Sequence, residues 1–502
     1  MSSPSKSINV AIVGGGFGGL ALLIGLQKYP HINAQVYESS PKTSDLGAGA
    51  VLGPNSQRAM SLIDPRIFEG FQKRAAFAVD EPDENGLYPW ITVVKGEEPN
   101  IGEQVMQFKH KVKGSTIHRA HFLDELAKLI EPGRISFDKH LVEIQENGED
   151  KPVILSFKDG TTAKADVVIG ADGIHSRIRK YVLGPNHPAA EATFTGAIIH
   201  RAVVPIQKAK DLLGEENVKQ DFTIRNGKDG LVFAFPMANN TLYYLGVTTF
   251  RNEPVERDQW ISSPNITILN EKFATYSDFV RKQVSLVPND GSTLGWSIWE
   301  MPPPPTYVKG RVVIMGDAAH AATPFQGVGA SQAIEDALVL EKLLGKYHDP
   351  TKKSIYRFSP VETTKLVLEV YDTVRRFRSL KIATKSSETG RILTGAEPGV
   401  SMNAADIRDQ MKGRQDWVWD CDQEGQVKDA YLLFEERQFA AARNEISRNT
   451  GIQKAEKPPA AASPPVATET EKPPMGKPST RDAMRYMLYS SKTKFRTMLK
   501  SH

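Results

Sequence analysis

The chain has 502 residues, more than one compact core usually organises, so two or three subdomains are expected. Its 63 lysines and arginines and 59 aspartates and glutamates give a net charge of only +4. Ten basic and four acidic residues lie between Gln453 and His502, which leaves a net of −2 for the rest. That near-neutral body argues against a nucleic-acid-binding protein.

The single cysteine, Cys421, excludes a disulfide framework and a thiolate metal site within one chain. The histidines show no metal-ligand spacing either, so no metal is expected. Residues 1–7 lack the apolar run of a signal peptide, and no run of about 18 apolar residues exists that could span a membrane. We therefore expect a cytoplasmic protein.

The first element pattern is a strand, a turn, a helix and a second strand. Ile8–Val13 is a short apolar run typical of a buried parallel strand. A helix is predicted over Leu20–Tyr29, where Pro30 stops it, and a strand over Ala34–Tyr37. This order is typical of a dinucleotide-binding unit.

The turn of this unit has the spacing G-x-G-x-x-G at Gly14, Gly16 and Gly19. Gly14 permits a tight turn, Gly16 lets the backbone approach a pyrophosphate, and Gly19 lets the helix pack on the strand. The start of the helix offers N–H groups and partial positive charge to phosphates. Glu38, about 20 residues later, can accept hydrogen bonds from ribose hydroxyls. These features fit NAD as well as FAD.

The later chain adds strands of two kinds. Asp166–Gly170 and Arg311–Gly316 are predicted as buried strands, whereas Thr193–Phe250 alternates apolar and polar residues as an antiparallel sheet does. Helices are predicted over Ser331–Gly345 and Lys365–Ile392. We infer an α/β fold in which a discontinuous Rossmann-like nucleotide domain contains an inserted β-sheet domain and is followed by C-terminal helices.

Five regions are predicted from these patterns. The nucleotide domain comprises residues 1–78, 105–190 and 295–345, the substrate domain 79–104 and 191–294, and the C-terminal helical region 346–452. Residues 453–480 are rich in proline and cannot bury enough apolar surface to fold, so they are predicted to be a disordered linker. Residues 481–502 are predicted to form an amphipathic basic helix, suited to a weak contact with a membrane or a partner.

Two further motifs decide between the cofactors. Gly170–Gly173 reads Gly-Ala-Asp-Gly, and Gly316–His320 reads Gly-Asp-Ala-Ala-His. With the first glycine loop, their order and spacing resemble the class A FAD-dependent monooxygenases, the aromatic hydroxylases that include salicylate hydroxylase, fungal phenol hydroxylases and 4-hydroxybenzoate hydroxylase. The resemblance extends from about Asn9 to about Ala430. It implies a 4-hydroxybenzoate hydroxylase-like fold, with FAD binding by the nucleotide domain.

The resemblance also implies the reaction. An aromatic substrate, phenolic or a phenolic acid, would be hydroxylated with NAD(P)H and O₂ through a flavin C4a-hydroperoxide. Two alternatives stay open. One is an FAD-dependent epoxidase that acts on an alkene in secondary metabolism. The other is an interaction protein that acts through its C-terminal helix and holds FAD only for stability.

Several cofactor residues follow from the resemblance. The carboxylate of Asp317 would contact the ribityl chain of FAD. Pro324 and the turn that ends at Gly329 and Ala330 would bring backbone N–H groups beside the flavin ring. A helix begins at this turn, and its positive end would favour the anionic reduced flavin.

Other cofactor residues have a second interpretation. Arg119 would reach the FAD diphosphate, which suits a planar guanidinium, or it is a surface residue near a helix start. Gly49 and Ala50 resemble the loop that passes over the flavin. Asp172 would serve the cofactor, or cap a helix that starts near Ile174, and both roles are compatible.

The substrate side of the site rests on three residues. Arg201 occupies the position whose arginine faces the substrate cavity in salicylate-type and fungal phenol hydroxylases. It could hold a carboxylate or lower the pKa of a phenol, or it could pair with a neighbouring acid. Phe235 stands where some relatives have tyrosine, so no phenolic hydrogen bond is expected there. Trp296 is expected to line or back the cavity, although large aromatic residues usually belong to the core.

Overall fold

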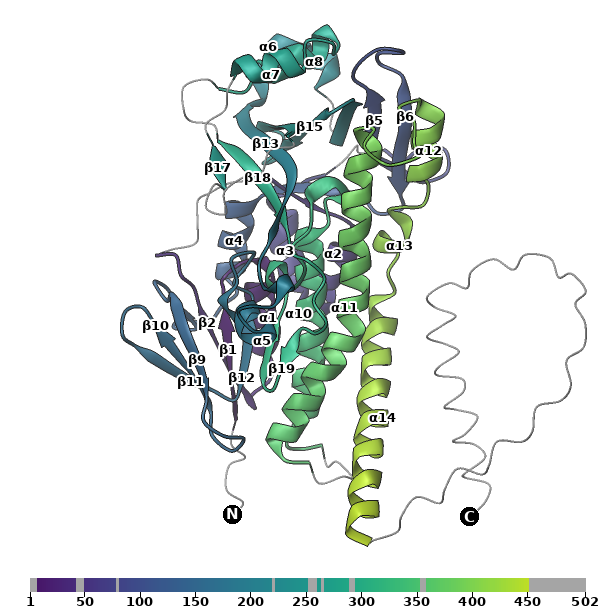
Figure 1. The fold of residues 1–502 in the computed structure, drawn as a ribbon. Helices are drawn as coiled ribbons and strands as arrows, with labels where there is room; N and C mark the ends of the chain where they lie inside the picture. The colour runs from purple at the N-terminus through teal and green to yellow at the C-terminus, as the bar shows by residue number, and fades with distance from the viewer. Residues whose placement is uncertain are drawn as a thin grey trace, which may run out of the picture. The chain divides into compact units, whose positions relative to one another are not determined.

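The computed structural model describes residues 7–41, 49–77, 81–218, 222–251, 260–262, 266–288, 294–352 and 358–450. Figure 1 shows the elements that these residues form. The predicted linker at 453–480 and the predicted helix at 481–502 lie outside the described residues. Within the described part, no helix combines the length and the apolar character that a membrane crossing requires.

A six-stranded sheet forms the nucleotide-binding part of the protein. Its strands, in spatial order, are β19 (Val308–Lys309), β20 (Val312–Ile314), β12 (Val167–Gly170), β1 (Ile8–Val13), β2 (Ile32–Tyr37) and β8 (Ile135–Ser136). All neighbours are parallel except β19 and β20. The five parallel strands have the order expected of a dinucleotide-binding sheet, which confirms the predicted α/β fold.

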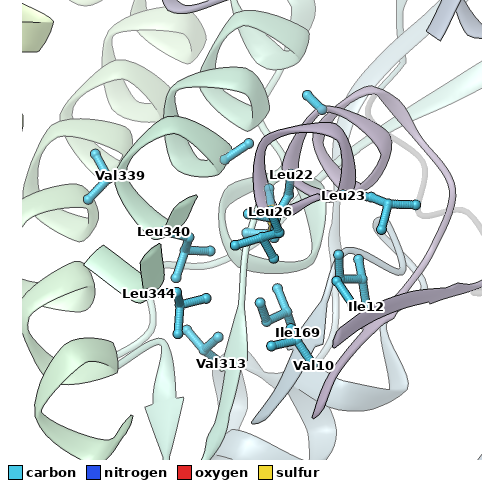
Figure 2. Close-up of a cluster of buried hydrophobic side chains, with 14 of the residues drawn as sticks. Val10, Ile12, Leu22, Leu23, Leu26, Ile169, Val313, Val339, Leu340 and Leu344 are labelled. Atoms are coloured by element: carbon cyan, nitrogen blue, oxygen red, sulfur yellow. The ribbon is translucent and has the colours of Figure 1, made fainter. Parts of the chain in front are cut away.

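The core of this part lies between the sheet and two helices, α1 (Phe17–Leu26) and α10 (Gly329–Tyr347). Figure 2 shows Leu22 and Leu26 of α1 close to strand residues, with Leu340 of α10 on the other side. All ten residues of α1 are buried, because strands cover one side of it and α10 the other. The helix starts three residues before the predicted Leu20, directly after the glycine turn.

A second, eight-stranded sheet forms the inserted part. In spatial order its strands are β17 (Ile261–Ser262), β18 (Gly295–Glu300), β13 (Thr193–Pro205), β16 (Leu242–Phe250), β15 (Gly230–Met237), β14 (Phe222–Gly227), β5 (Tyr88–Lys95) and β6 (Gln104–His110). The alternating stretch predicted at Thr193–Phe250 supplies β13 to β16. Because β6 pairs with β5, the predicted boundary at residue 105 falls inside this hairpin.

The two faces of the eight-stranded sheet have different neighbours. One face presents Val232, Leu245 and Val247 to the helices α6 (Ile206–Leu213), α7 (Ile266–Lys272) and α8 (Asp278–Val284). Figure 1 shows these three helices together beyond β13 and β15. The opposite face turns toward the nucleotide-binding part. Since side chains alternate along each strand, neighbouring residues serve different faces.

Smaller elements complete the described residues. The strands β3 (Gly49–Leu52), β7 (Ser115–His118) and β4 (Ala76–Phe77) form one small antiparallel sheet, and β9 (Leu141–Glu146), β10 (Val153–Phe157) and β11 (Thr162–Ala165) form another. The remaining helices are α2 (Pro54–Ile63), α3 (Pro65–Gln72), α4 (Arg119–Ala127), α5 (Arg177–Leu183), α9 (Asp317–His320), α11 (Pro360–Leu393), α12 (Ala404–Met411), α13 (Asp416–Trp419) and α14 (Gln423–Thr450).

Asp336 of α10 joins three segments through one buried carboxylate. It accepts hydrogen bonds from the backbone N–H of Gly316 at 2.9 Å, from Nε2 of His320 at 2.6 Å and from Nε of Arg375 on α11 at 2.7 Å. Burial alone would raise the pKa of Asp336, but His320 and Arg375 outweigh it and hold that pKa below its usual range. The neighbouring Glu335 binds the same arginine at 2.7 Å. These bonds fix the Gly316 turn relative to α10 and α11.

We predict that Asp336→Asn lowers the free energy of unfolding by about 3–5 kcal/mol, because it leaves a buried arginine short of an anionic partner. Urea denaturation with saturating FAD measures the change. Glu369→Gln is the matched control, since Glu369 lies on the exposed side of α11 and should change stability by less than about 0.5 kcal/mol. Equal unfolding midpoints for the two variants would contradict this assignment.

Candidate active site

Two adjoining cavities lie beside the first glycine loop. The first has a volume of about 410 Å³ and extends from the first glycine loop to the wall of the eight-stranded sheet. The second, of about 480 Å³, lies beside the end of β2. Four residues line both cavities: Gly16, Arg119, Ala171 and Gly173. Together the cavities form one elongated groove, the shape that a dinucleotide requires.

The first glycine loop has the geometry predicted for it. Gly14 has a φ of +111°, and a side chain on it would collide with the carbonyl of Ala171. A side chain on Gly19 would collide with the backbone of Gly14. A Cβ on Gly16, in contrast, would meet no atom within 4 Å, and Gly16 lines both cavities. Because no side chain caps α1, its first N–H groups can receive a phosphate.

Glu38 follows β2 and lines the second cavity. Its carboxylate accepts hydrogen bonds from the backbone N–H of Gly15 at 2.6 Å and of Ser40 at 2.8 Å. These bonds hold the carboxylate beside the glycine loop. A carboxylate oxygen can accept more than one hydrogen bond, so Glu38 can still accept from a ribose hydroxyl.

Asp172 lines the same cavity and caps a helix. It accepts hydrogen bonds from Oγ of Ser176 at 2.6 Å and from the backbone N–H of Arg177 at 2.8 Å. The capped helix, α5, begins at Arg177, three residues later than predicted, because Ser176 is its N-cap. Arg179 of the same motif is buried and donates to the carbonyl oxygens of Ala318 and Ala319 at 3.0 and 2.7 Å. Arg179 therefore connects the segment that follows Gly170–Gly173 to the Gly316–His320 motif.

The Gly316–His320 motif lies at the first cavity. Asp317 begins α9, is exposed, and is the one carboxylate among the described residues that line this cavity. Pro324, Gly329 and Ala330 line it as well. No side chain caps the start of α10, so its first N–H groups remain available at Gly329 and Ala330.

The loop that contains Pro324 is fastened to α11. Oγ of Ser386 accepts a hydrogen bond from the backbone N–H of Gln326 at 3.2 Å and donates to the carbonyl oxygen of Thr323 at 2.6 Å. The ring of Phe325 lies against Gly390, where any side chain would collide with it. No sequence motif indicates these contacts, because Ser386 follows Thr323 by 63 residues.

Three further predicted residues line the groove, two on β3 and one at the place where the two cavities meet. Gly49 and Ala50 of β3 line the first cavity, and a Cβ on Gly49 would lie 3.1 Å from the ring of Phe235. Arg119 begins α4, is exposed, and lines both cavities. A guanidinium at the junction of the two cavities suits a diphosphate between two larger groups.

One face of the eight-stranded sheet forms an aromatic wall of the first cavity. Its rings are those of Phe222, Phe233, Phe235 and Tyr244, whose neighbouring pairs stack with centroid distances of 4.7–5.9 Å. Gly246 makes room for them, because a side chain there would collide with Phe233. The predicted Phe235 therefore belongs to a larger aromatic surface that no sequence motif indicates.

Arg201 lies on β13 beside this aromatic wall and lines the cavity. Its guanidinium lies 5.4 Å from the ring centre of Trp296. Its Nε is buried without a hydrogen-bond partner, and none of the described acidic side chains forms an ion pair with it. The alternative of a neighbouring acid on the sheet therefore finds no partner in the described part of the chain. Trp296 does not line either cavity and instead backs the guanidinium.

Most of the predicted site residues thus meet in one groove. Tyr244 is the main residue that the sequence did not single out. It follows Tyr243 directly, and only the register of β16 decides which of the two faces the cavity. The alternation of apolar and polar residues does not distinguish them, because both tyrosines are buried.

Comparison with known proteins agrees with this geometry. A family model described as an FAD binding domain matches residues 119–354. The chain is 37% identical to a 6-methylsalicylate 1-monooxygenase of Aspergillus terreus, over 86% of this chain and 93% of that protein. It is 31% identical to a salicylate hydroxylase of Pseudomonas putida, over 86% of this chain and 96% of that protein.

Solved structures show the same relationship. A salicylate hydroxylase substrate complex aligns with a TM-score of 0.72 and 29% identity, and covers 85% of this chain and 98% of that one. The structure of CtdE in complex with FAD and a substrate has a TM-score of 0.69 at 21% identity, which supports the fold alone. By sequence, fold and groove, the chain belongs to the family of FAD-dependent aromatic monooxygenases, the class A flavoproteins of the salicylate hydroxylase type.

Proposed function

We propose that the protein hydroxylates a phenolic acid of the 2-hydroxybenzoate type with NAD(P)H and O₂. The observation that supports this substrate class is Arg201, a half-buried cation without an acidic partner among the described residues, beside an aromatic wall. A buried charge is costly unless an opposite charge meets it, so this site favours an anionic ring. The relatives named for salicylate and 6-methylsalicylate have substrates of that kind.

The residues of the groove fit FAD along its whole length. We assign the second cavity to the adenosine half, with Glu38 on the ribose and Asp172 beside it. Arg119 and the N–H groups after Gly16 would hold the diphosphate, and Asp317 the ribityl chain. When bound, FAD supplies electron transfer from NAD(P)H and the activation of O₂.

The N–H groups at the start of α10 would face the flavin ring from Gly329 and Ala330, next to Pro324 and below Gly49 and Ala50. A helix start carries partial positive charge, which stabilises negative charge on a reduced ring. The same helix bears Asp336, so the buried ion pairs described above hold this end in place. The backbone of this helix start would therefore supply the positive field at the ring.

Arg201 would act on the substrate in two ways. Its positive charge favours an ionised ring acid over a neutral one, and it also lowers the pKa of a phenol close to it. The aromatic wall packs against the ring and excludes water from the reacting carbon. We place this reaction in the cytoplasm, where NAD(P)H is available to the enzyme.

Asp317→Ala is expected to weaken FAD binding by about 1–3 kcal/mol, or roughly 10- to 100-fold in Kd, because a ribityl hydroxyl loses its acceptor. Fluorescence titration of the apoprotein with FAD measures this change. Asp211→Ala is the matched control, since Asp211 is exposed on α6, on the far face of the eight-stranded sheet. A Kd for Asp317→Ala equal to that of the control would remove Asp317 from the FAD site.

Arg201→Lys is expected to keep FAD, but with 2-hydroxybenzoate as the substrate its KM should rise about 10-fold and more H₂O₂ should be released per NAD(P)H, because lysine lacks the planar fork. Product, CO₂ and H₂O₂ are measured across a panel of phenols and phenolic acids. Arg225→Lys is the control, because Arg225 stacks on Phe279 at 4.3 Å on the opposite face of the same sheet. Unchanged coupling and KM in Arg201→Lys would sink the assignment. No turnover of any phenolic acid by the wild type would sink the proposed function itself.

A further inference from the structure

Tyr244 is a buried tyrosine whose hydroxyl has no established task. Its side chain is 3% exposed, yet it lines the first cavity. The ring stacks on Phe235 with a centroid distance of 4.7 Å and an interplanar angle of 15°, and on Phe233 at 5.9 Å. These stacked rings restrict the orientation of the phenol, so its hydroxyl occupies a defined position in the wall.

Arg201 is the charged lining residue on the strand next to that of Tyr244. Both residues line the first cavity from neighbouring strands, and the charge of the guanidinium opposes the rise that burial causes in the pKa of Tyr244. Gly246 is the direct cross-strand neighbour of Arg201, and it has no side chain that could separate Arg201 from Tyr244. The two groups therefore share one corner of the cavity.

The chemistry of the pair sets the direction of its hydrogen bonds. A guanidinium has only donors, whereas a phenol hydroxyl both donates and accepts. In a hydrogen bond between these two side chains, Arg201 donates and the oxygen of Tyr244 accepts. The O–H of Tyr244 can then donate to a third group. Burial raises the pKa of Tyr244, so the hydroxyl keeps its proton at neutral pH.

No protein acceptor for that O–H is found among the described residues of this corner. The lining around it consists of Ile199, Ile224, Leu231 and the phenylalanines of the aromatic wall. The one carboxylate on the described lining is Asp317, which lies across the cavity on α9. Arg201 and Tyr244 therefore supply two kinds of donor to the lining of one cavity, with no acidic side chain beside them among the described lining residues.

We propose that Arg201 and Tyr244 form one subsite for the carboxylate of the substrate, and that Tyr244 sets the preference for ring acids over neutral phenols. A carboxylate has two oxygens, which can meet donors from two neighbouring strands at once, whereas a phenol offers a single oxygen. The inference rests on the proposed function and adds a residue that determines specificity. Tyr244 acts here as a binding residue that positions the ring.

The test compares Tyr244→Phe with Tyr243→Phe in the FAD-loaded full-length protein. Phenylalanine keeps the stacked ring at position 244 and removes only the hydroxyl. Tyr243 is the matched control because it is equally buried, points to the opposite face and accepts a hydrogen bond from Gln283 at 3.2 Å. Two ligands are compared, 2-hydroxybenzoate and resorcinol, a phenol without a carboxylate. Their binding is followed by the change in flavin absorbance, and KM and kcat are measured with each.

For Tyr244→Phe we expect both Kd and KM to rise about tenfold with the ring acid 2-hydroxybenzoate, because one donor to an anion is lost. The values for resorcinol should stay within about twofold, since this ligand never used the donor. Tyr243→Phe should leave the ratio between the two ligands unchanged, whatever it does to stability.

Two results would overturn the subsite. An equal loss for both ligands in Tyr244→Phe would mean that the hydroxyl serves the packing of the wall, and no loss for either would mean that it has no role in binding. A wild type that binds resorcinol but no ring acid would refute the proposed substrate class, and the carboxylate subsite with it. If the wild type binds the ring acid normally, failure of the subsite is distinguished from failure of the proposed function.

Discussion

The buried carboxylate of Asp336 is the constraint on which both halves of the groove depend. It holds the backbone N–H of Gly316 and the ring of His320 at the two ends of α9, and the guanidinium of Arg375 on α11. Gly316 has a φ of +57°, a left-handed conformation that suits glycine, and the hydrogen bond from its N–H to Asp336 holds the turn before Asp317 against α10. Removing one partner of a buried ion pair leaves an uncompensated charge, so Asp336 constrains the position of this turn and the stability of the core together.

A second constraint is the strict alternation of side chains in the eight-stranded sheet. The strands β13, β15 and β16 supply one face to the helices α6 to α8 and the other to the cavity. Tyr243 and Tyr244 show the consequence, since one packs with α8 while its neighbour reaches the ligand space. A slip of one residue in register would exchange them and would bury Arg201 in an apolar core.

The parts of this protein that the sequence predicts are those with local physical causes. Gly14, Gly16 and Gly19 fold a turn whose requirements lie within a few residues, so the loop and Glu38 could be placed in advance. The class of the fold was predictable for the same reason. Tyr244, Ser386 and the role of Arg179 were not, because each acts through contacts with distant segments that no spacing indicates. The start of α5 was misplaced because Ser176, directly before Arg177, is the N-cap, whereas Asp172 lies four residues earlier and accepts hydrogen bonds from the N–H groups of Arg177 and Ile178 across the intervening turn.

The distribution of charge along the groove follows from these constraints and fits the order of ligands proposed for it. Arg119 stands where the two cavities meet, Arg201 stands at the far wall, and apolar or aromatic side chains fill most of the lining between them. A ligand set with an anionic diphosphate, a planar ring and a second, anionic ring matches that sequence of environments. The only described carboxylate on the first cavity, Asp317, lies between the two arginines, where hydroxyl groups need an acceptor and an anion would be repelled. An acid at the position of Tyr244 would neutralise Arg201 and leave no charge for a substrate, whereas a phenol adds a donor and keeps the cation free.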